Sequence, residues 1–359
     1  MDLIAVAQQF RLPGAVLHLG PYGGGNVNDT YLVVLDSRPE RYLLQRLNPA
    51  VFAAPRLLMA NLRRVLAHMA DRLCRECGGR RWELPDVVPL RAGGALFVDA
   101  DGACWRLLRF IEQTRVCETV TNHAQALQVG CGLGRFHRLV SDLPPAELHD
   151  TLPGFHVTPT YLAQYDALIA GGRGEKENDF CRRFIEARRD LAPVLERQCG
   201  QGQLPLRVMH GDPKVNNFLL DEASGRVVSL VDLDTVKPGL VQYDLGDCLR
   251  SCCNPAGEEA SDPGGVDFDT DCCRAILQGY LAEAAVFLVE NDYAVLYDAV
   301  RLITFELGLR FYTDALAGNR YFKAVDPEHN LRRAMVQFRL VERIEARERA
   351  IRAIVDELR

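Results

Sequence analysis

The sequence predicts an α+β protein with a small N-terminal sheet lobe and a larger, mainly helical C-terminal lobe. Up to about residue 112, apolar residues occur in short or alternating runs that turn residues separate, which is typical of strands. From residue 113 onwards, apolar residues recur at helical spacing in most segments. We therefore expect an N-terminal lobe of residues 1–112 and a C-terminal lobe of residues 113–359.

The N-terminal lobe is expected to hold an antiparallel sheet and one long helix. Five runs have the length and composition of strands: residues 15–19, 27–35, 41–47, 95–98 and 104–111. Apolar residues at helical spacing predict a helix from Pro55 to about Cys77. Proline suits the first helical turn, and Gly78-Gly79 is expected to end the helix.

The C-terminal lobe is expected to be built mainly from helices. Their predicted ranges are residues 124–140, 158–170, 179–198 and 271–318, with an amphipathic helix at the C-terminus. Between residues 206 and 231, three short apolar runs and a turn at Ser224-Gly225 predict strands instead. The first helix contains Gly130, Gly132 and Gly134, which would weaken it unless close packing requires them.

The overall composition is that of an ordinary soluble globular protein, with 48% apolar and 25% charged residues. The formal charge of −6 provides no basic footprint, so neither nucleic acid nor an anionic membrane is an expected partner. No apolar stretch reaches the roughly 18 residues that a membrane-spanning helix needs. The N-terminus carries an acid and soon turns polar, unlike a signal peptide, so a cytoplasmic location is expected.

Twelve cysteines are many, but their spacing predicts no disulfide or zinc framework. Cys74-x-x-Cys77 has no second Cys-x-x-Cys or histidine pair to complete a zinc site. In a long cytosolic chain, reduced thiols that pack as small apolar residues are the favoured interpretation. We therefore assign no metal to the cysteines.

The strongest functional signal is the stretch from His210 to Asn217, which reads His-Gly-Asp-Pro-Lys-Val-Asn-Asn, followed by an apolar run that ends in Asp232. Asp212, Asn217 and Asp232 are expected to converge from two adjacent backbone segments. A loop carboxylate can orient an attacking hydroxyl, while an amide oxygen and a second carboxylate suit Mg²⁺, so the set indicates phosphoryl transfer. A turn or helix cap is the alternative for Asp212 alone, but the three spacings together favour function.

This stretch resembles the catalytic and metal-binding loops of the aminoglycoside phosphotransferase superfamily, which includes choline, homoserine and sugar kinases and is structurally related to protein kinases. Within that superfamily, five blocks resemble the bacterial N-acetylhexosamine 1-kinases: residues 22–31, 42–48, 237–240, 243–247 and 327–331. The resemblance implies a protein-kinase-like two-lobed fold with ATP and Mg²⁺ in the cleft. It also implies a small-molecule sugar substrate, N-acetylglucosamine or N-acetylgalactosamine, that becomes the sugar 1-phosphate.

The same resemblance implies a role for each residue of the C-terminal part of the cleft. Asp212 would be the catalytic base, and Asn217 and Asp232 would be the magnesium ligands, with Asp234 as a neighbour that could replace Asp232. Structural support is expected from His210, Asp244 and Asp247. For the last two residues, a place near the metal and a bracing role at the loop both remain open.

Nucleotide contacts are expected from the N-terminal lobe and from the connection between the lobes. Gly23, Gly24 and Gly25 lie between two strands, where the backbone either turns tightly or approaches an anion. Phe110 and Ile111 lie in the predicted connection, where backbone groups could bind an adenine edge. An ordinary core strand is the alternative for these two residues.

One position departs from the superfamily pattern. A lysine is expected on the third strand, paired with a glutamate on the following helix, but the strand carries Gln45 and Arg46 instead. Strand alternation places Gln45 and Arg46 on opposite faces. The group that contacts the nucleotide phosphates therefore stays open, with these two residues as candidates.

The acceptor is expected to contact Arg310 and Tyr321, in a segment that resembles the hexosamine-binding segment of the sugar 1-kinases. The alternative for Arg310 is an internal pair with Glu306, one helical turn away. Two other functions remain open. The acidic loop from Glu258 to Asp271 could serve a cationic acceptor such as an amino alcohol or aminoglycoside, and the missing lysine would suit a nucleotide-binding pseudokinase.

Overall fold

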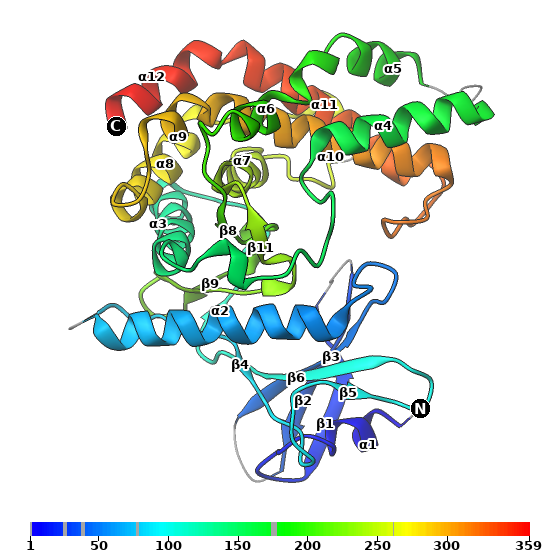
Figure 1. Cartoon of the computed structure of the whole chain (residues 1–359), viewed down its shortest axis with the longest axis vertical. Helices are drawn as coiled ribbons and strands as arrows, with labels where there is room; N and C mark the ends of the chain where they lie inside the picture. The colour runs from blue at the N-terminus through cyan, green and yellow to red at the C-terminus, as the bar shows by residue number, and fades with distance from the viewer. Residues whose placement is uncertain (1, 24–26, 37–39, 77–78, 174–177, 261) are drawn as a thin grey trace.

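The computed structural model describes residues 2–359 except 24–26, 37–39, 77–78, 174–177 and 261. A sheet-rich N-terminal part and a larger helical part are stacked along the long axis of the molecule, with helix α2 (Pro55–Arg75) between them (Figure 1). The predicted α+β, protein-kinase-like class is thereby confirmed.

The N-terminal sheet is antiparallel, with neighbouring strands in the order β1-β2-β3-β6-β4 and with β5 paired to β6. The strands are β1 (Val16–Pro21), β2 (Asp29–Leu35), β3 (Arg41–Leu47), β4 (Asp86–Val87), β5 (Phe97–Val98) and β6 (Cys104–Arg109). All five expected strands agree with these bounds to within a few residues. The sequence missed β4, which is two residues long and has no room to show a period.

Two helices accompany this sheet. Helix α1 (Leu3–Ala7) packs its buried Val6 and Ala7 against one face of the sheet, in a core with Leu44 and Trp105. Helix α2 begins with Pro55 at its first turn, as expected, and packs its apolar side against the C-terminal lobe. Because α1 and α2 occupy different sides, the second face of the sheet looks towards the C-terminal lobe.

The C-terminal lobe is mainly helical. Its helices are α3 (His123–Val140), α4 (Thr158–Leu168), α5 (Asp179–Glu186), α6 (Val194–Gly200), α7 (Val241–Cys252), α8 (Thr270–Ala284), α9 (Glu290–Ala294), α10 (Leu296–Ala317), α11 (His329–Ala346) and α12 (Glu348–Leu358). The helix expected at residues 179–198 is interrupted before Pro193, which cannot continue a helical hydrogen-bond ladder. The helices expected between residues 271 and 318 are α8, α9 and α10, and Asp292 accepts the Val289 N–H at the start of α9.

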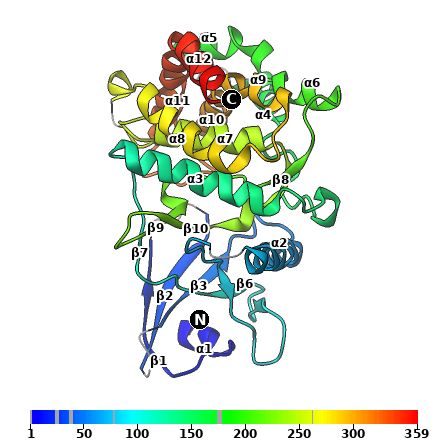
Figure 2. The same ribbon diagram turned by 90° about the vertical axis from the view of Figure 1, so that its left-hand side faces the viewer.

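Five short strands form the part of this lobe that faces the sheet. Strands β7 (Thr114–Arg115), β9 (Phe218–Asp221) and β10 (Val227–Leu230) make one small antiparallel sheet, and β8 (Arg207–Met209) pairs with β11 (Lys237–Gly239). Single 3-10 turns at Val215–Asn217 and Leu233–Thr235 lie between these strands. The ends of four strands therefore meet in one small region, below helix α3 (Figure 2).

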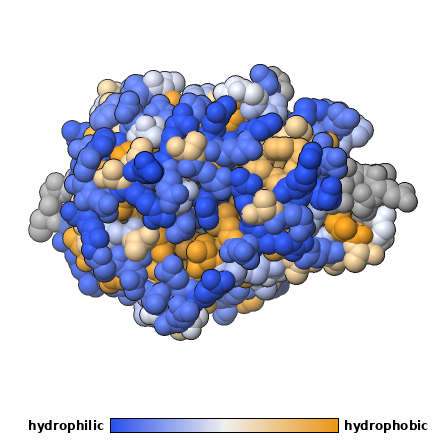
Figure 3. All heavy atoms as spheres, turned by 90° about the horizontal axis from the view of Figure 1, so that it is seen from above, coloured by the Kyte–Doolittle hydropathy of each residue, from blue (hydrophilic) through white to orange (hydrophobic). Residues whose placement is uncertain are grey.

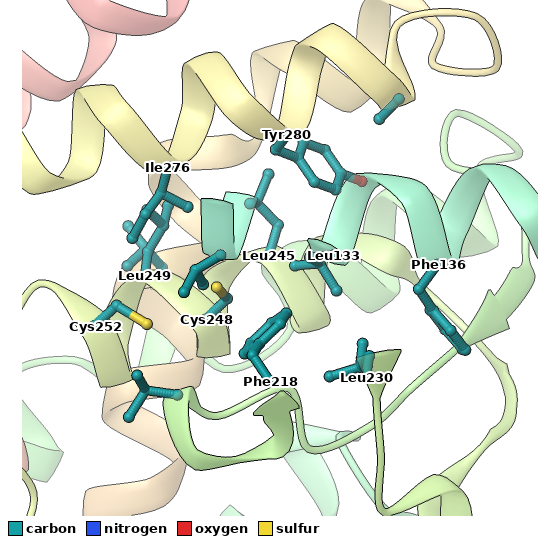
Figure 4. Packing of buried hydrophobic residues seen from close by; sticks show 14 of the residues in the cluster. Leu133, Phe136, Phe218, Leu230, Leu245, Cys248, Leu249, Cys252, Ile276 and Tyr280 are labelled. Carbon is teal, nitrogen blue, oxygen red and sulfur yellow. The ribbon is translucent and has the colours of Figure 1, made fainter. Parts of the chain in front are cut away.

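The core behind these strands is held by helices α3, α7 and α8 (Figure 4). A Cβ atom on Gly134 would lie 2.6 Å from the Tyr280 carbonyl oxygen, and one on Gly130 would clash with the carbonyl of Ile276. Gly130 and Gly134 of α3 are therefore required by its close crossing with α8. Phe218 of β9 and Leu230 of β10 pack beneath this crossing, so the core fixes the hairpin that carries the candidate site (Figure 4).

The cysteines that the structure describes are all free thiols, and several of them, including Cys248 and Cys252, pack within this core. The face of the helical lobe seen in Figure 3 is mostly hydrophilic, with hydrophobic residues in scattered small patches. Among the described helices, none combines the length and apolar character required to cross a membrane.

Candidate active site

The loop that joins β8 to β9 carries Asp212 and lies against the segment after β10. Pairing of Phe218 with Leu230 places the start of β9 beside the end of β10, and the Val231 N–H donates to the Asn217 carbonyl at 3.0 Å. Asn217 and Asp232 consequently lie at the same end of the hairpin. The register of two short strands thus brings together residues that are distant in the chain.

Two residues that follow Asp212 in this loop, Lys214 and Asn217, both bond to it. The Asn217 Nδ2 donates to the Asp212 carbonyl at 2.7 Å, which leaves the Asn217 side-chain oxygen for another partner. The Lys214 Nζ lies 2.7 Å from Asp212 Oδ2. Burial alone would lower the pKa of Lys214, but the nearby Asp212 and Asp232 carboxylates raise it. Lys214 therefore stays charged between the two acids, a role that the sequence analysis did not assign.

Asp232 has the backbone conformation of a functional position. Its φ of 65° and ψ of 56° lie in the left-handed region, which is uncommon for residues other than glycine. The residue is exposed, yet the surrounding protein still desolvates its carboxylate. This desolvation, together with the neighbouring Asp234 carboxylate, raises the pKa of Asp232 to about 6. No hydrogen bond to its carboxylate is found among the described residues, so the oxygens can accept a ligand.

The donor set at this point fits a small, hard cation. Amide and carboxylate oxygens from Asn217 and Asp232 are the ligand type that Mg²⁺ prefers, and a Mg²⁺ site commonly uses one or two such groups together with phosphate oxygens. Among the described residues, no group of three His, Cys, Asp or Glu side chains forms a self-sufficient metal cage. The site is thus suited to a metal that arrives with a phosphate group.

Asp244 at the start of α7 braces the loop from below. Its carboxylate accepts the N–H groups of His210 at 2.5 Å and Gly211 at 2.8 Å, and it lies 2.8 Å from His137 Nε2. Although burial alone would raise the pKa of Asp244, the His137 side chain lowers it. Asp247 instead pairs with Arg250 at 2.8 Å, one turn further along the same helix.

His210 supports the loop as a neutral imidazole. Its Nδ1 accepts the Asp212 N–H at 3.2 Å, and its Nε2 lies 3.0 Å from the Val231 carbonyl, which can only accept. Nε2 therefore carries the proton, and burial lowers the pKa of His210. The geometry is that of a brace between the two segments that carry the acids.

The cleft-facing side of the N-terminal sheet presents two rows of side chains. Thr30, Gln45 and Arg106 form one row across β2, β3 and β6, and Leu32, Leu43 and Leu108 form the next. The three leucines are only half-buried, and they share the face of the sheet from which Arg106 reaches Asp234 of the C-terminal lobe. Arg46 is exposed on the other face, opposite Trp105, so the structure separates the two candidates of the third strand.

Arg106 is the charged residue of this face that the sequence analysis missed. Its guanidinium pairs with the Asp234 carboxylate, with Nη2 to Oδ2 at 2.9 Å, and both side chains are 2% exposed. Two of its nitrogens also donate to Gln45 Oε1, at 2.9 and 2.7 Å. Asn28 adds a bond to Asp234 Oδ2 at 2.7 Å. Arg106 and Asn28 of the N-terminal sheet lobe therefore both bond to Asp234, which lies two residues after Asp232. The only signal in the sequence was an arginine inside an apolar strand.

The remaining nucleotide candidates lie at the rim of the cleft. Gly23 has a φ of +71° and open space around its Cα, whereas Gly24 and Gly25 lie outside the described residues. The Phe110 N–H donates to the Arg41 carbonyl at 2.9 Å, and the Ile111 carbonyl accepts from Thr114 Oγ1 at 2.7 Å. These two peptides have therefore committed some of their polar groups within the protein, and an adenine edge would have to use the others.

Arg310 of α10, which was predicted to contact the acceptor, lies inside a cage of aromatic rings. Its guanidinium carbon is 4.9 Å from the ring centre of Tyr161 and 5.8 Å from that of Tyr321, with the rings of Phe155 and Phe322 at 5.3 and 5.4 Å. Burial alone would lower its pKa, but the Tyr161 and Tyr321 hydroxyls and a nearby carboxylate raise it. The side chain is a permanent cation lined by π faces.

The internal pair of Arg310 with Glu306 is also present, but it is loose, with Nη1 and Oε1 3.9 Å apart. Glu306 bonds more closely to His156 at 2.8 Å and to Thr158 at 2.7 Å. The guanidinium therefore keeps donors available for a ligand. Tyr321, which is 50% exposed, forms the outer wall of the cage.

The profile of the phosphotransferase enzyme family (APH) matches residues 18–276, which is well over half of the 359-residue chain. Among solved structures, a microcompartment-associated aminopropanol kinase is 16% identical with a TM-score of 0.68, and the match covers 98% of this chain and 99% of that one. An aminoglycoside phosphotransferase from Alicyclobacillus acidocaldarius is 16% identical with a TM-score of 0.59, covering 100% and 95% of the two chains. A spectinomycin phosphotransferase in complex with ADP and spectinomycin is 13% identical with a TM-score of 0.60, covering 96% and 97%. These likenesses establish the shared fold.

Proposed function

The chain belongs to the phosphotransferase enzyme family, and from this premise we propose that it transfers the γ-phosphoryl group of ATP to the anomeric hydroxyl of an N-acetylhexosamine. In this reaction the hydroxyl oxygen bonds to the γ-phosphorus, the bond from that phosphorus to the bridging oxygen breaks, and ADP leaves. The products are the sugar 1-phosphate and ADP. The observation that carries the proposal is the meeting of Asp212, Asn217 and Asp232 at one end of the β9–β10 hairpin.

Asp212 would orient the acceptor hydroxyl and take its proton. Phosphoryl transfer depends on positioning more than on strong basicity, so a carboxylate held by a rigid loop is sufficient. Lys214 holds one oxygen of Asp212 at 2.7 Å and keeps a positive charge near the place where the phosphates would lie. Asp244 and His210 fix the backbone on both sides of Gly211, which limits the movement of Asp212.

Asn217 and Asp232 would hold Mg²⁺. Bound there with the nucleotide, the ion would supply charge neutralisation at the phosphate oxygens. Asn217 is prepared for this role because its Nδ2 is engaged with the Asp212 carbonyl, which turns its side-chain oxygen away from that bond.

Asp232→Asn is expected to raise the magnesium concentration for half-maximal turnover by about ten-fold or more, since one anionic ligand is lost. The measurement is initial rate against magnesium concentration at saturating ATP and acceptor. Asp221→Asn, which changes a carboxylate at the far end of β9, is the matched control and should leave the curve in place. An unchanged curve in Asp232→Asn would exclude this residue as a metal ligand.

ATP would lie between the sheet and the hairpin. The half-buried row of Leu32, Leu43 and Leu108 offers an apolar surface for the adenine ring. The Phe110–Ile111 connection directly follows β6, the strand that contains Leu108. The solved spectinomycin phosphotransferase carries ADP, and a solved aminoglycoside 2'-phosphotransferase carries GDP, which supports a nucleotide in this cleft. No lysine of β3 is available for the phosphates, so we propose Lys214 and Arg106, whose charges act on Asp232, as the cations for this role.

The acceptor pocket suits a neutral polyol better than a cation. Arg310 can donate to sugar hydroxyls or to an acetamide carbonyl, and the rings around it can pack against the sugar. A positively charged acceptor would instead meet a buried guanidinium.

Three acids of the loop that favoured a cationic acceptor already form ion pairs within the protein. Glu258 pairs with Arg250 at 3.0 Å, Glu259 pairs with Arg333, and Asp267 pairs with Arg347 at 2.6 Å. These acids therefore have cationic partners within the protein. The amino alcohol alternative still has support from a solved relative, because the aminopropanol kinase shares the fold.

The deciding experiment is an acceptor panel that measures ADP release with ATP and Mg²⁺. N-acetylglucosamine and N-acetylgalactosamine are expected to be turned over, and ethanolamine, choline, homoserine and aminoglycosides are expected to give only background. Turnover of an amino alcohol or aminoglycoside without turnover of either sugar would replace the proposed acceptor.

Arg310→Lys is expected to raise the acceptor KM by roughly 10- to 100-fold and to leave the KM for ATP unchanged. The loss of a planar set of charged donors accounts for this size, since hydrogen bonds to charged groups contribute about 1.5–3 kcal/mol. Arg339→Lys is the matched control, because Arg339 also lies over a ring, Phe180 at 4.5 Å, but on α11 away from the cage. An unchanged acceptor KM in Arg310→Lys would remove Arg310 from the acceptor site.

A further inference from the structure

We propose that His156 is a positioning residue that links α10, the proposed acceptor helix, to the catalytic loop. Through this link, the position of Asp212 depends on Glu306 and Arg310 of α10. The inference rests on the proposed function for the roles of Asp212 and Arg310. His156 lies just before α4 and is buried. No motif in the sequence pointed to it.

Two bonds make the link. The His156 Nε2 lies 2.8 Å from the Gly211 carbonyl oxygen, directly before Asp212, and the Nδ1 lies 2.8 Å from Glu306 Oε1. The N–H of Gly211 already donates to Asp244. His156 therefore holds the carbonyl side of the residue that precedes the catalytic base, while Asp244 holds its amide side. A shift of Glu306 would move the imidazole and, with it, this peptide group.

The protons on the two His156 nitrogens indicate that the link between His156 and Glu306 is an ion pair. The Gly211 carbonyl can only accept, so Nε2 carries a proton. Glu306 also accepts from Thr158 at 2.7 Å and lies beside Arg310, so its other carboxylate oxygen is the acceptor for the His156 Nδ1. Burial alone would lower the pKa of His156, but Glu306 raises it above its usual value. The other charged groups that face the imidazole are Arg310 of α10, Asp247 of α7 and Glu196 of α6.

The backbone of His156 is strained, and its surroundings hold it in that state. Its φ is 56°, in the left-handed region that costs free energy for residues other than glycine. The imidazole stacks on Tyr243 of α7 with ring centres 5.4 Å apart and an angle of 15° between the planes. A strained residue that several neighbours hold in place is typical of a functional position.

The loose contact of Arg310 with Glu306 is where an acceptor would act on this link. Because Nη1 and Oε1 are 3.9 Å apart, an acceptor that takes donors from Arg310 would change the hold of Arg310 on Glu306. Glu306 passes that change to His156 and to Gly211 through the two short bonds. Acceptor binding and the placement of Asp212 are then coupled through three side chains.

Hydrogen exchange of the ligand-free protein tests the link without using activity. In His156→Asn, asparagine tolerates the left-handed backbone but cannot span both acceptors. Amides of residues 207–218 are expected to exchange roughly ten-fold faster, the effect of losing a hydrogen bond to a charged group. His68→Asn is the matched control, because it removes a histidine–carboxylate contact at 2.8 Å between α2 and Asp142, which is not part of the link from Glu306 to Gly211. Unchanged exchange in a folded His156→Asn protein would overturn the proposal.

The kinetic arm uses whichever acceptor the wild-type enzyme turns over best. His156→Asn is expected to lower kcat by about 10²-fold, the effect of misplacing a catalytic group by about 1 Å, with the KM for ATP unchanged. If the wild-type enzyme turns over no acceptor, the proposed function is wrong. The hydrogen-exchange experiment would still test whether His156 links Glu306 to Gly211. An active wild type with unchanged kcat in His156→Asn would sink the link and leave the proposed function standing.

The pH profile separates a positioning role from a merely structural one. Because the pKa of His156 is raised in the folded protein, the ionic link is complete below the ordinary histidine value and is lost as pH rises through the folded value. The wild-type kcat is expected to fall on the alkaline side for this reason. Glu306→Gln, which keeps the shape but removes the charge, should move this fall to lower pH. If Glu306→Gln and the wild type share one alkaline limb, the ionic link is excluded.

Discussion

Replacing Asp212 with Asn is expected to lower kcat by about 10²- to 10⁴-fold and to leave both KM values close to those of the wild type, because a positioned general base contributes an effect of that size. The amide keeps the size of the side chain and the loop bonds of the backbone, including the Asp212 N–H to His210. It removes the ability to take a proton from the acceptor hydroxyl. The measurement is steady-state turnover with the best acceptor of the panel.

A carboxylate outside the catalytic loop serves as the control for this prediction. Asp221→Asn, at the far end of β9, is expected to retain wild-type turnover because Asp221 is held by Ser224 and Arg81 away from the cleft. If Asp212→Asn turns over at the wild-type rate, then Asp212 is not the base and the proposed mechanism fails. The same result would also exclude the pseudokinase alternative, because the protein would then be catalytically active.

Replacing Asp234 with Ala is expected to lower the free energy of unfolding by about 3–5 kcal/mol, because it leaves the buried Arg106 guanidinium without its anionic partner. Both side chains are 2% exposed, and the pair joins β6 of the N-terminal sheet to the turn beside Asp232. Asn28 would lose its bond to the same carboxylate. The measurement is chemical denaturation followed by circular dichroism.

An exposed ion pair gives the matched control for Asp234→Ala. Asp71 and Arg75 lie one turn apart on α2 with 57% and 72% of their side chains exposed, so Asp71→Ala should change stability by only about 0.2–0.5 kcal/mol. The double variant Arg106→Met with Asp234→Leu should be more stable than Asp234→Ala, because no unpaired charge remains. Equal stability of the single and double variants would show that the burial of Arg106 is not what makes the pair important.

Much of the local structure near the site was predictable from spacing. The strand at residues 41–47, the helix that begins at Pro55 and the short strands around residue 220 all follow from periods of two or 3.6 residues and from turn residues. The close approach of Asn217 and Asp232 follows from a hairpin that the sequence indicates by itself. These are properties of short segments, so no knowledge of distant parts of the chain was needed.

Other features of the site have no local signal. Arg106 reads as an ordinary strand residue until its partner 128 residues away is known, and His156 reads as a loop residue until Gly211 and Glu306 lie beside it. Glu258, Glu259 and Asp267 read as a free anionic surface until their arginine partners are placed. In each case the meaning of a charge depends on a contact that only folding creates.

The sequence by itself determined the α+β class, the order of the longer elements and the loop that we propose holds the phosphoryl-transfer residues, because periodicity and close spacing encode them. Only the tertiary structure decided which charges are already paired, which face of the sheet a side chain occupies and which buried histidine reaches the loop. The physical reason is that electrostatic interactions fall with distance in space rather than in sequence. Partners 150 positions apart, such as His156 and Glu306, are invisible until the chain has folded.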